Sequence, residues 1–454
     1  MGASRLKRKK VRDDAEDRIS NLPDSVLCYI LSFLPTKDAG RTSILSTRWK
    51  YLFVSSPNLD FDDSLRVHPL EVDCGRESRR SFVNFVYRVL ALRSSLHMNR
   101  FRLKCDVNDD DPHVNTWVSA VARCNVRELE LKLDVTNDLT KDTNLDLLPC
   151  DLLTCRTLAV LKLEVNGDLN VPSDVSFPSL KTLHLKFLFL DYESFKRVLS
   201  GCPVLEDLLT FYCRFIPKVQ VFDISIPTLK RLTLGLQYLS TGGEVCESEV
   251  VVDAPCLQYL RYSGNVAKRY AFKGLTSPAE VHLCITQDRL SSDQQLIKLF
   301  EAISKVESLH LSENAVWVLE VNQCWLPAFP NLTRLELDTY SSCRFVLLPE
   351  LLYCSPNLKV LVIGRVVFLD VKGDMISSRT ASCLSSHLKE IELKEFNGKN
   401  DELELVEYFL ERAEVLEKMT ISFFAPRCPR KEFYIGKKLL TIPRRSKTCR
   451  IILT

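Results

Sequence analysis

The sequence predicts an α/β protein built mainly as a repetitive solenoid with a curved parallel sheet. Three observations predict this fold class. Leucine accounts for 72 of the 454 residues, whereas glycine accounts for only 14. The spacing Leu-x-x-Leu-x-Leu recurs along the chain, and a proline precedes many of its copies. A unit that cannot bury its own leucines buries them by stacking on its neighbours, which produces a solenoid with one continuous core.

The leucine spacing is clean in three copies and looser in the others. The clean copies begin at Leu180, Leu229 and Leu332. The looser copies accept Val, Ile, Tyr, Thr or Met and begin at Val126, Leu158, Leu205, Leu257, Val306, Leu358, Leu388 and Leu416, with a degenerate copy at Val281 and Leu283. Neighbouring copies mostly start 21 to 32 residues apart. These lengths indicate leucine-rich repeats, each a short strand, a turn and a helical or irregular return.

A proline stands two residues before the first leucine in six copies: Pro178, Pro203, Pro227, Pro255, Pro330 and Pro356. Proline stops a helix and favours extended backbone, so each should lead directly into a strand. Between the strands, helices are expected at 192–199 and 293–303, and a further helix at 402–414. The polar residues 60–80 predict a connector, and 106–112 and 239–249 predict loops.

The Leu-x-Leu ending of each copy has the period of a strand with one buried face. It predicts that Leu183, Leu185, Leu232, Leu234, Leu335 and Leu337 are buried. The residues between them should lie on the concave, solvent-facing side and form a candidate substrate surface: Glu130, Lys132, Lys162, His184, Lys186, Thr233, Arg261, His310 and Glu336. Because this set mixes charges of both signs, it favours a polar protein partner over a polyanion. The alternative is that these are ordinary solvated strand positions.

Residues 18–55 contain no repeat and predict three short helices. The apolar residues of the first helix lie on one wide face at helical spacing: Val26, Leu27, Ile30, Leu31 and Leu34. Pro35 ends this helix, Thr36 can begin a second that runs to Ile44, and Ser46 can begin a third that carries Trp49. These three helices have more apolar surface than they need to pack against one another. The surplus either binds a partner or packs on the solenoid.

The basic tail at residues 1–17 is expected to be disordered and is a candidate nuclear import signal through Arg5, Lys7, Arg8, Lys9, Lys10 and Arg12. Acidic residues follow it immediately, and the whole chain carries a net charge of only +3. Nucleic acid is therefore not an expected partner. No apolar run is long enough for a membrane helix, so we expect the nucleus, the cytoplasm or both.

The residues do not form a recognisable catalytic or metal-binding motif. The chain lacks Cys-x-x-Cys, closely spaced histidine pairs, phosphate-binding glycine loops and nucleophile elbows. We therefore expect no enzyme activity, no cofactor and no metal site, and we interpret the 17 cysteines as mainly small buried apolar residues.

Residues at both ends of the chain resemble a known family. Leu22-Pro23-Asp24, Ile30-Leu31, Leu34-Pro35, Ser43-Ile44-Leu45-Ser46 and Arg48-Trp49 resemble the F-box common in plants. Cys383-Leu384, Leu388-Lys389, Gly398, Glu402, Leu405-Val406, Tyr408, Leu410, Ala413, Leu416, Met419, Ile421, Pro443-Arg444, Ser446 and Cys449 resemble the FBD domain that accompanies such F-boxes. Gly40 departs from the F-box pattern, and glycine inside a helix costs about 0.5–1 kcal/mol relative to alanine.

The resemblance implies five regions. These are a basic tail at 1–17, an F-box at 18–60, a connector and solenoid cap at 61–100, leucine-rich repeats at 101–376 and an FBD-like domain at 377–454. It also implies a non-catalytic substrate adaptor of a Skp-cullin-F-box ubiquitin ligase. The F-box would bind a Skp-type linker, which carries the cullin and RING subunits, and the solenoid would capture a protein substrate.

By the same resemblance, the candidates for F-box core and linker contacts are Leu22, Pro23, Val26, Leu27, Ile30, Leu31 and Trp49. The sequence does not divide the two roles. Two other functions stay open: a scaffold that recruits the linker without degradation, and a receptor whose substrate binding is gated by a small molecule.

Overall fold

The computed structural model describes residues 19, 21–63, 72–93, 97–107, 112–135, 149–169, 171–215, 219–236, 248–273, 280–285, 293–322, 325–338, 347–364, 381–424 and 429–454. Its helices are α1 (Asp24–Leu31), α2 (Thr36–Arg41), α3 (Val72–Leu92), α4 (Pro112–Arg123), α5 (Cys150–Leu153), α6 (Tyr192–Ser200), α7 (Asp293–Ala302), α8 (Glu313–Asn322), α9 (Leu347–Cys354), α10 (Ser382–Ser386), α11 (Asn400–Arg412) and α12 (Pro429–Thr441). Two 3-10 turns, η1 (Thr42–Ile44) and η2 (Leu52–Ser55), follow α2. None of the described helices is both long and apolar enough to cross a bilayer.

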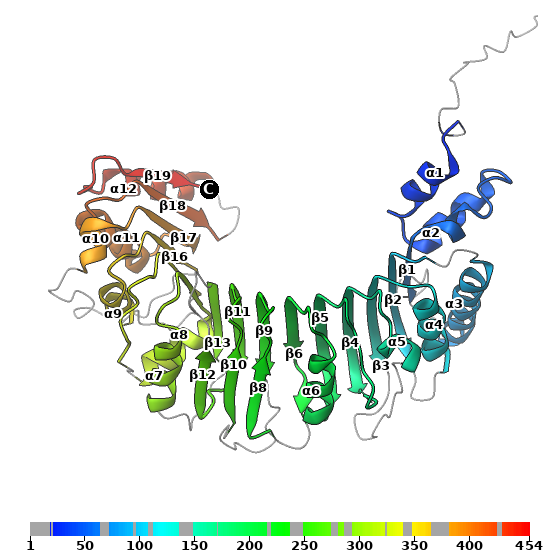
Figure 1. Ribbon diagram of the computed structural model, residues 1–454. Coiled ribbons are helices and arrows are strands. Elements are labelled where there is room, and N and C mark those ends of the chain that lie inside the picture. Colours follow the sequence, from blue (N-terminus) through cyan, green and yellow to red (C-terminus); the bar gives the residue numbers. More distant parts are fainter. Residues whose placement is uncertain are drawn as a thin grey trace, which may run out of the picture.

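One long parallel sheet runs through nearly the whole described chain. Its strands, in spatial order, are β1 (Asn58–Asp62), β2 (Arg100–Val107), β3 (Glu128–Val135), β4 (Val160–Asp168), β5 (Thr182–Leu190), β6 (Asp207–Phe211), β9 (Arg231–Leu236), β11 (Tyr259–Gly264), β13 (Glu280–Ile285), β14 (Ser308–Leu311), β15 (Arg334–Leu337), β16 (Val360–Ile363), β17 (Glu390–Phe396), β18 (Lys418–Phe423) and β19 (Arg450–Leu453), and the short β7 (Arg214–Phe215) pairs with β5. The row of strands bends, so that α1 and α2 at one end and α12 at the other rise on the same side of it (Figure 1). The predicted curved parallel solenoid is confirmed.

The strands pair in register, with leucine beside leucine. Leu309, Leu335 and Leu361 are paired neighbours on β14, β15 and β16. The six leucines predicted to be buried are at most 2% exposed, and the residues between them, such as His184 and Glu336, are half-buried. The predicted register is confirmed, because a slip of one residue would exchange the two faces.

The repeat prolines have a more specific role than the sequence indicated. In all six copies the first leucine donates its backbone N–H to the carbonyl oxygen of the residue just before the proline, at 3.0–3.3 Å. This is the hydrogen bond of a β-turn with proline at its second position, where the ring's fixed φ is pre-set. Each proline therefore fixes a β-turn, and the strand begins two residues after the last residue of that turn.

Several segments differ from the prediction. Residues 60–80 are not only a connector, because they hold the end of β1 and the start of α3, while 64–71 lie outside the described residues. The expected third N-terminal helix is a set of turns ending in η2. Most residues of the expected loops at 106–112 and 239–249 lie outside the described part of the chain. The expected helices at 192–199, 293–303 and 402–414 are confirmed as α6, α7 and α11 within three residues at each end.

Some repeats return through strands instead of helices. β8 (Val221–Ser225), β10 (Glu249–Asp253) and β12 (Arg269–Lys273) form a second parallel sheet in the order β12-β10-β8. Burial alternates along β8 and β10, with Phe222, Ile224, Val250 and Val252 buried and the residues between them more exposed. This period of two favours a strand over a helix on the return side.

The core is continuous from the first strand to the last. One buried apolar cluster extends from Leu59 to Cys449 and includes residues of α10, α11 and α12. Because β17, β18 and β19 also continue the same sheet, the FBD-like segment shares the core of the repeats. The N-terminal module has a small core of its own, formed by Leu27, Leu31, Ala39, Trp49 and Leu52.

Candidate functional site

The N-terminal module is held firmly against the solenoid. Arg93, just after α3, donates hydrogen bonds to the carbonyl oxygens of Val54, Ser56 and His97 at 2.7–3.1 Å. The Thr36 hydroxyl accepts the Asp60 backbone N–H of β1 at 2.7 Å. Phe53 packs against both the small core and the large one. These contacts fix the direction in which the module projects from the sheet.

The structure divides the seven residues predicted for core and linker contacts. Leu27, Leu31 and Trp49 are buried in the small core, and Leu22 is half-buried against it. The others, Pro23, Val26 and Ile30, are exposed at the surface of α1. Hence only three of the seven are free to contact a partner with most of their side chain.

The same module exposes more apolar residues, on α1 and in the segments that follow it. We define the apolar face of the module as Val26, Tyr29, Ile30, Phe33, Leu34, Ile44 and Leu45, all of them exposed. Phe33 is 71% exposed and Ile44 is 87% exposed, and Phe33 makes an edge contact with Tyr29 at 4.9 Å between ring centroids. Five of these residues were not among the predicted contact residues: Tyr29, Phe33, Leu34, Ile44 and Leu45. The surplus of apolar residues around the first helix indicated that the module binds a partner, but it did not indicate which face makes the contact.

The nine predicted substrate-surface residues all come to one face of the long sheet, which we call the polar sheet face. Glu130, Lys162 and His184 are register partners on β3, β4 and β5. Thr233, Arg261, His282, His310 and Glu336 continue the same row on β9, β11, β13, β14 and β15. Lys132 and Lys186 lie two residues further along β3 and β5, and both are register partners of Glu164 on β4.

Many charges on the polar sheet face neutralise one another. Glu130 pairs with Arg100 at 3.1 Å and with Arg102 at 3.3 Å. Glu164 accepts from Lys132 and, at 3.4 Å, from Lys186. Burial raises the pKa of Glu164, but the two lysines outweigh it and lower the pKa below its ordinary value. Partly exposed pairs of this kind contribute little stability, about 0–1 kcal/mol each.

Two cations in this row lack such partners. Lys162 and Arg261 form no ion pair within 4.0 Å with any residue of the described ranges, and Arg261 is exposed. Their charges are therefore available to an acidic group of a partner. Thr233 lies beside Arg261 in the row and adds a neutral hydroxyl.

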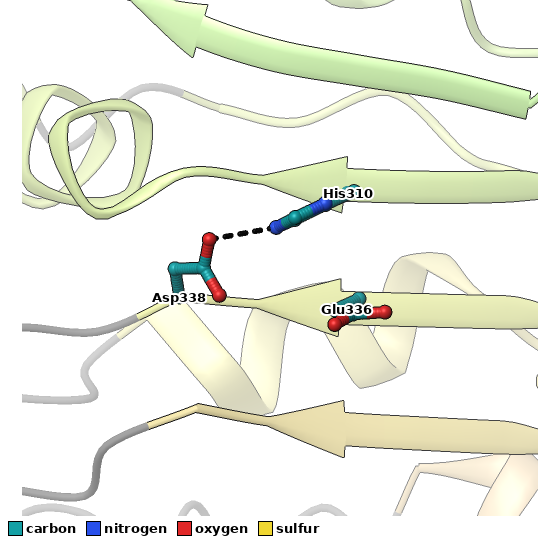
Figure 2. A group of neighbouring side chains, drawn as sticks. All are labelled: His310, Glu336 and Asp338. Carbon is teal, nitrogen blue, oxygen red and sulfur yellow. Dashed lines mark hydrogen bonds and ion pairs between the residues drawn. The ribbon is translucent and has the colours of Figure 1, made fainter. Parts of the chain in front are cut away.

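Histidines and carboxylates gather towards the C-terminal part of the polar sheet face. His310 Nε2 is 2.8 Å from Asp338 Oδ2, and one ligand atom each of His310, Glu336 and Asp338 lie within 4.8 Å of one another (Figure 2). The hydrogen bond from His310, together with its charge, outweighs burial and lowers the pKa of Asp338. Glu336 accepts from Lys394 Nζ at 2.7 Å and pairs with Arg334 at 3.3 Å. His310 and Glu336 were among the predicted surface residues, whereas Asp338, which immediately follows β15, was not.

The sequence predicted that the cysteines are mainly small buried residues, and half of those in the described ranges are buried. The twelve cysteines in the described ranges are free thiols, and six of them are buried. Burial raises the pKa of Cys202 to about 12 and that of Cys383 to about 11. Such thiols are poor nucleophiles because the thiolate is the reactive form. The import candidates Arg5, Lys7, Arg8, Lys9, Lys10 and Arg12 lie outside the described residues.

A leucine-rich solenoid that carries a small helical module with an exposed apolar face is an architecture typical of proteins that bind other proteins. Comparisons with known proteins agree. Family models match an F-box domain at residues 19–61, the leucine-rich repeats of the FBD-associated F-box protein At5g56370 at 114–274, and the FBD at 377–421.

Relatives from Arabidopsis thaliana match most of the chain. The putative F-box/LRR-repeat protein At3g59230 is 34% identical over 91% of this chain and 90% of its own length. The F-box/LRR-repeat protein At3g59200 is 34% identical over 96% of this chain and 88% of its own length, and At4g14096 is 32% identical over 90% and 88%. The chain belongs to the F-box/LRR-repeat family, with its F-box, repeats and FBD in that order.

Proposed function

We propose that this protein is the substrate-recognition adaptor of a Skp-cullin-F-box ubiquitin ligase. The observation that carries the proposal is the apolar face of the module, which stays exposed although the module has its own core and is fixed to the solenoid. Several large exposed apolar side chains on one small module indicate a protein contact. An adaptor needs no bond chemistry, because it raises the local concentration of a substrate near the rest of the ligase.

In this proposal the Skp-type linker covers Ile30, Phe33 and Ile44. Large exposed apolar side chains at the centre of an interface are the usual hot spots, and their loss costs about 2 kcal/mol or more. The linker in turn brings the cullin and RING subunits. The firm junction at Arg93 then holds the polar sheet face at a defined distance from the ligase machinery.

The test is a titration of the full chain with a Skp-type linker protein. Phe33→Glu should weaken the complex at least about 30-fold, which corresponds to about 2 kcal/mol. Phe433→Glu is the matched control, because Phe433 on α12 is also an exposed aromatic residue, at 76%, and lies at the opposite end of the chain. Equal affinity of both variants and the native chain would exclude this face as the linker site.

Co-purification separates a ligase adaptor from a scaffold. An adaptor should bring down linker, cullin and RING proteins together, and the Phe33→Glu variant should lose all three. Recovery of the linker without a cullin would favour the non-degradative scaffold. A gated receptor is distinguished by substrate binding that requires an added small molecule.

We place substrate capture on the polar sheet face. Lys162 and Arg261 support this placement, because their charges have no ionic partner among the described residues. Reversing both to glutamate should leave linker binding intact and weaken substrate binding. Lys186 is a poorer choice for charge reversal because it pairs with Glu164. Unchanged capture of an identified substrate by the double variant would move the site to the loops or the FBD segment.

For localisation we propose the nucleus, the cytoplasm or both, with residues 5–12 as the import signal. The chain with Lys7, Arg8, Lys9 and Lys10 replaced by alanine should be depleted from nuclei relative to the native chain. An unchanged distribution would remove this role from the tail.

A further inference from the structure

An exposed group of aromatic side chains interrupts the polar sheet face near the middle of the long sheet, where β5 and β6 lie (Figure 1). Phe187 of β5 and Tyr212, which directly follows β6, stack with their rings 11° from parallel and their centroids 5.3 Å apart. We call this pair the aromatic stack. Phe211 meets the Tyr212 ring edge-on at 4.3 Å. Phe187 and Tyr212 stay 39% and 41% exposed, so the stack is open to a partner.

The neighbouring contacts place the stack outside the core, on the solvent side of the sheet. Phe211 is the register partner of Lys186, which lies on the polar sheet face. Its Cδ2 is 2.9 Å from where a Cβ of Gly235 would be, and Gly235 follows Thr233 by two residues along that face. Phe211 is half-buried, yet within the described chain it does not pack against the apolar core. The Tyr212 ring, which contacts Phe211, therefore lies on the same side.

The backbone that carries both rings is one that bulky residues rarely adopt. The φ angle is +61° at Phe187 and +55° at Tyr212, in the left-handed region. Asparagine and glycine adopt this conformation more readily. Glu395 of β17 has a similar φ of +51° with a polar side chain, so the backbone alone does not require an aromatic ring. Exposed aromatic residues at strained positions indicate a function for the rings themselves.

Cations without an ionic partner surround the stack. Arg214 of β7 is exposed, lies over the Phe189 ring at 5.2 Å from its centroid, and forms no ion pair within 4.0 Å among the described residues. Lys162 on β4 is one strand away from β5, and Arg261 on β11 is two strands away from β6. At about 4.8 Å per strand, both lie within about 10 Å of the stack in the direction across the strands.

We propose that the aromatic stack binds an aromatic side chain in an extended acidic segment of the protein substrate, with Asp or Glu on both sides of that side chain. A third ring would extend the stack, because aromatic rings pack favourably in offset or edge-on contact. The acidic residues would pair with Lys162, Arg214 and Arg261. An extended chain advances about 3.3 Å per residue, so each acidic residue should lie within about three residues of the aromatic one. This inference names the chemistry of the segment captured on the polar sheet face, and it rests on the proposed function.

Single-stranded nucleic acid also stacks on aromatic rings, but the charges around the stack do not favour its phosphates. Glu130 and Glu164 lie on the neighbouring strands of the polar sheet face, and each already pairs with two cations. A nucleic acid carries a phosphate at every residue and needs a continuous positive groove. Separate free cations fit a peptide better, because its acidic residues can be spaced by neutral ones.

The experiment is selection of a random 12-residue peptide library on the full chain, followed by calorimetric titration with the enriched peptides. We expect these peptides to carry an aromatic residue with Asp or Glu within three residues on both sides. Tyr212→Asn should weaken their binding at least about tenfold. Because asparagine tolerates positive φ, hydrogen exchange around β6 should stay the same or become slower, whereas a merely structural ring would give faster exchange. The matched control Glu395→Asn, with similar φ in β17, should bind normally.

Arg214→Glu should also weaken binding, by a factor that shrinks as the salt concentration rises. This variant decides the matter if Tyr212→Asn does not fold, because Arg214 is exposed. Enriched peptides without the expected pattern, no enrichment over the Tyr212→Asn chain, or equal binding by the variants and the native chain would overturn the proposal. Tighter binding of a single-stranded 12-nucleotide RNA than of the peptides would assign the stack to nucleic acid instead. Peptide binding needs neither linker nor cullin, so a failed linker titration would refute the ligase role without affecting this result.

Discussion

Alanine at position 40 should stabilise the junction between the F-box and the solenoid. Gly40 is the fifth of six residues of α2, and its φ is not in the left-handed region. A Cβ built there would lie 3.7 Å from the ring of Phe85 on α3 and 3.8 Å from the ring of Phe53, which are ordinary van der Waals distances. The methyl group therefore fits without displacing a neighbour.

The magnitude has two parts. Replacing glycine by alanine inside a helix contributes about 0.5–1 kcal/mol. A fully buried methylene contributes about 0.8 kcal/mol, and a half-buried one roughly half of that. Together they predict about 1–1.4 kcal/mol, which lowers the local opening equilibrium about five- to tenfold.

Hydrogen exchange with mass spectrometry measures this locally, whereas global unfolding of a long solenoid is not expected to be two-state. Peptides covering α2 and η2 should exchange about five- to tenfold more slowly in Gly40→Ala, with no change in α11 or α12. Gly398→Ala is the contrasting variant, because Gly398 has φ +71° and its Cβ would lie 2.3 Å from Ile435 Cδ1. That variant should exchange faster around α11. Faster exchange of α2 in Gly40→Ala would refute the packing argument.

Three further outcomes are expected. Leu335→Ala should destabilise the central repeats by about 2–5 kcal/mol, measured by hydrogen exchange of peptides that cover β14, β15 and β16, because Leu335 is fully buried; a cost under 1 kcal/mol would contradict the assigned register. Glu402→Ala should speed hydrogen exchange at the start of α11, because the buried carboxylate accepts the backbone N–H groups of Asn397 and Lys399 at 2.8–3.1 Å and each loss costs about 1–3 kcal/mol. Glu164→Gln should lower the local stability by about 0.5 kcal/mol at pH 7, as for partly exposed pairs, measured by hydrogen exchange of peptides that cover β3, β4 and β5. Because the pKa of Glu164 is lowered on folding, the difference should disappear as the pH falls below about 4; a difference that grows on acidification would contradict the ion pairing.

The repeating part of the fold could be read from the sequence because it follows from local patterns. The leucine spacing fixes which strand residues are buried, so the paired leucines and the polar row between them were both predictable. The role of the prolines was only partly predictable. A proline restricts its own φ, but the β-turn hydrogen bond depends on where the following leucine packs.

The F-box face shows where local reasoning stops. The spacing of apolar residues on α1 marks them as important, but both sides of this short helix are apolar. Only the packing of Trp49 and Leu52 decides that Leu27 and Leu31 point inward and Ile30 and Phe33 outward. The same holds for the return segments, where β8, β10 and β12 form a sheet because they lie beside one another.

The sequence by itself determined the order of F-box, repeats and FBD, the buried leucine register and the candidate polar row, because each depends on neighbours a few residues apart. Tertiary structure alone decided the continuity of the FBD with the repeat sheet, the pairing of Glu164 with two lysines, and the stacking of Phe187 on Tyr212. These join residues about one repeat apart, and the loops between strands vary in length. The repeat register places equivalent positions of neighbouring strands about 4.8 Å apart, but which of their side chains bond to one another depends on the folded packing.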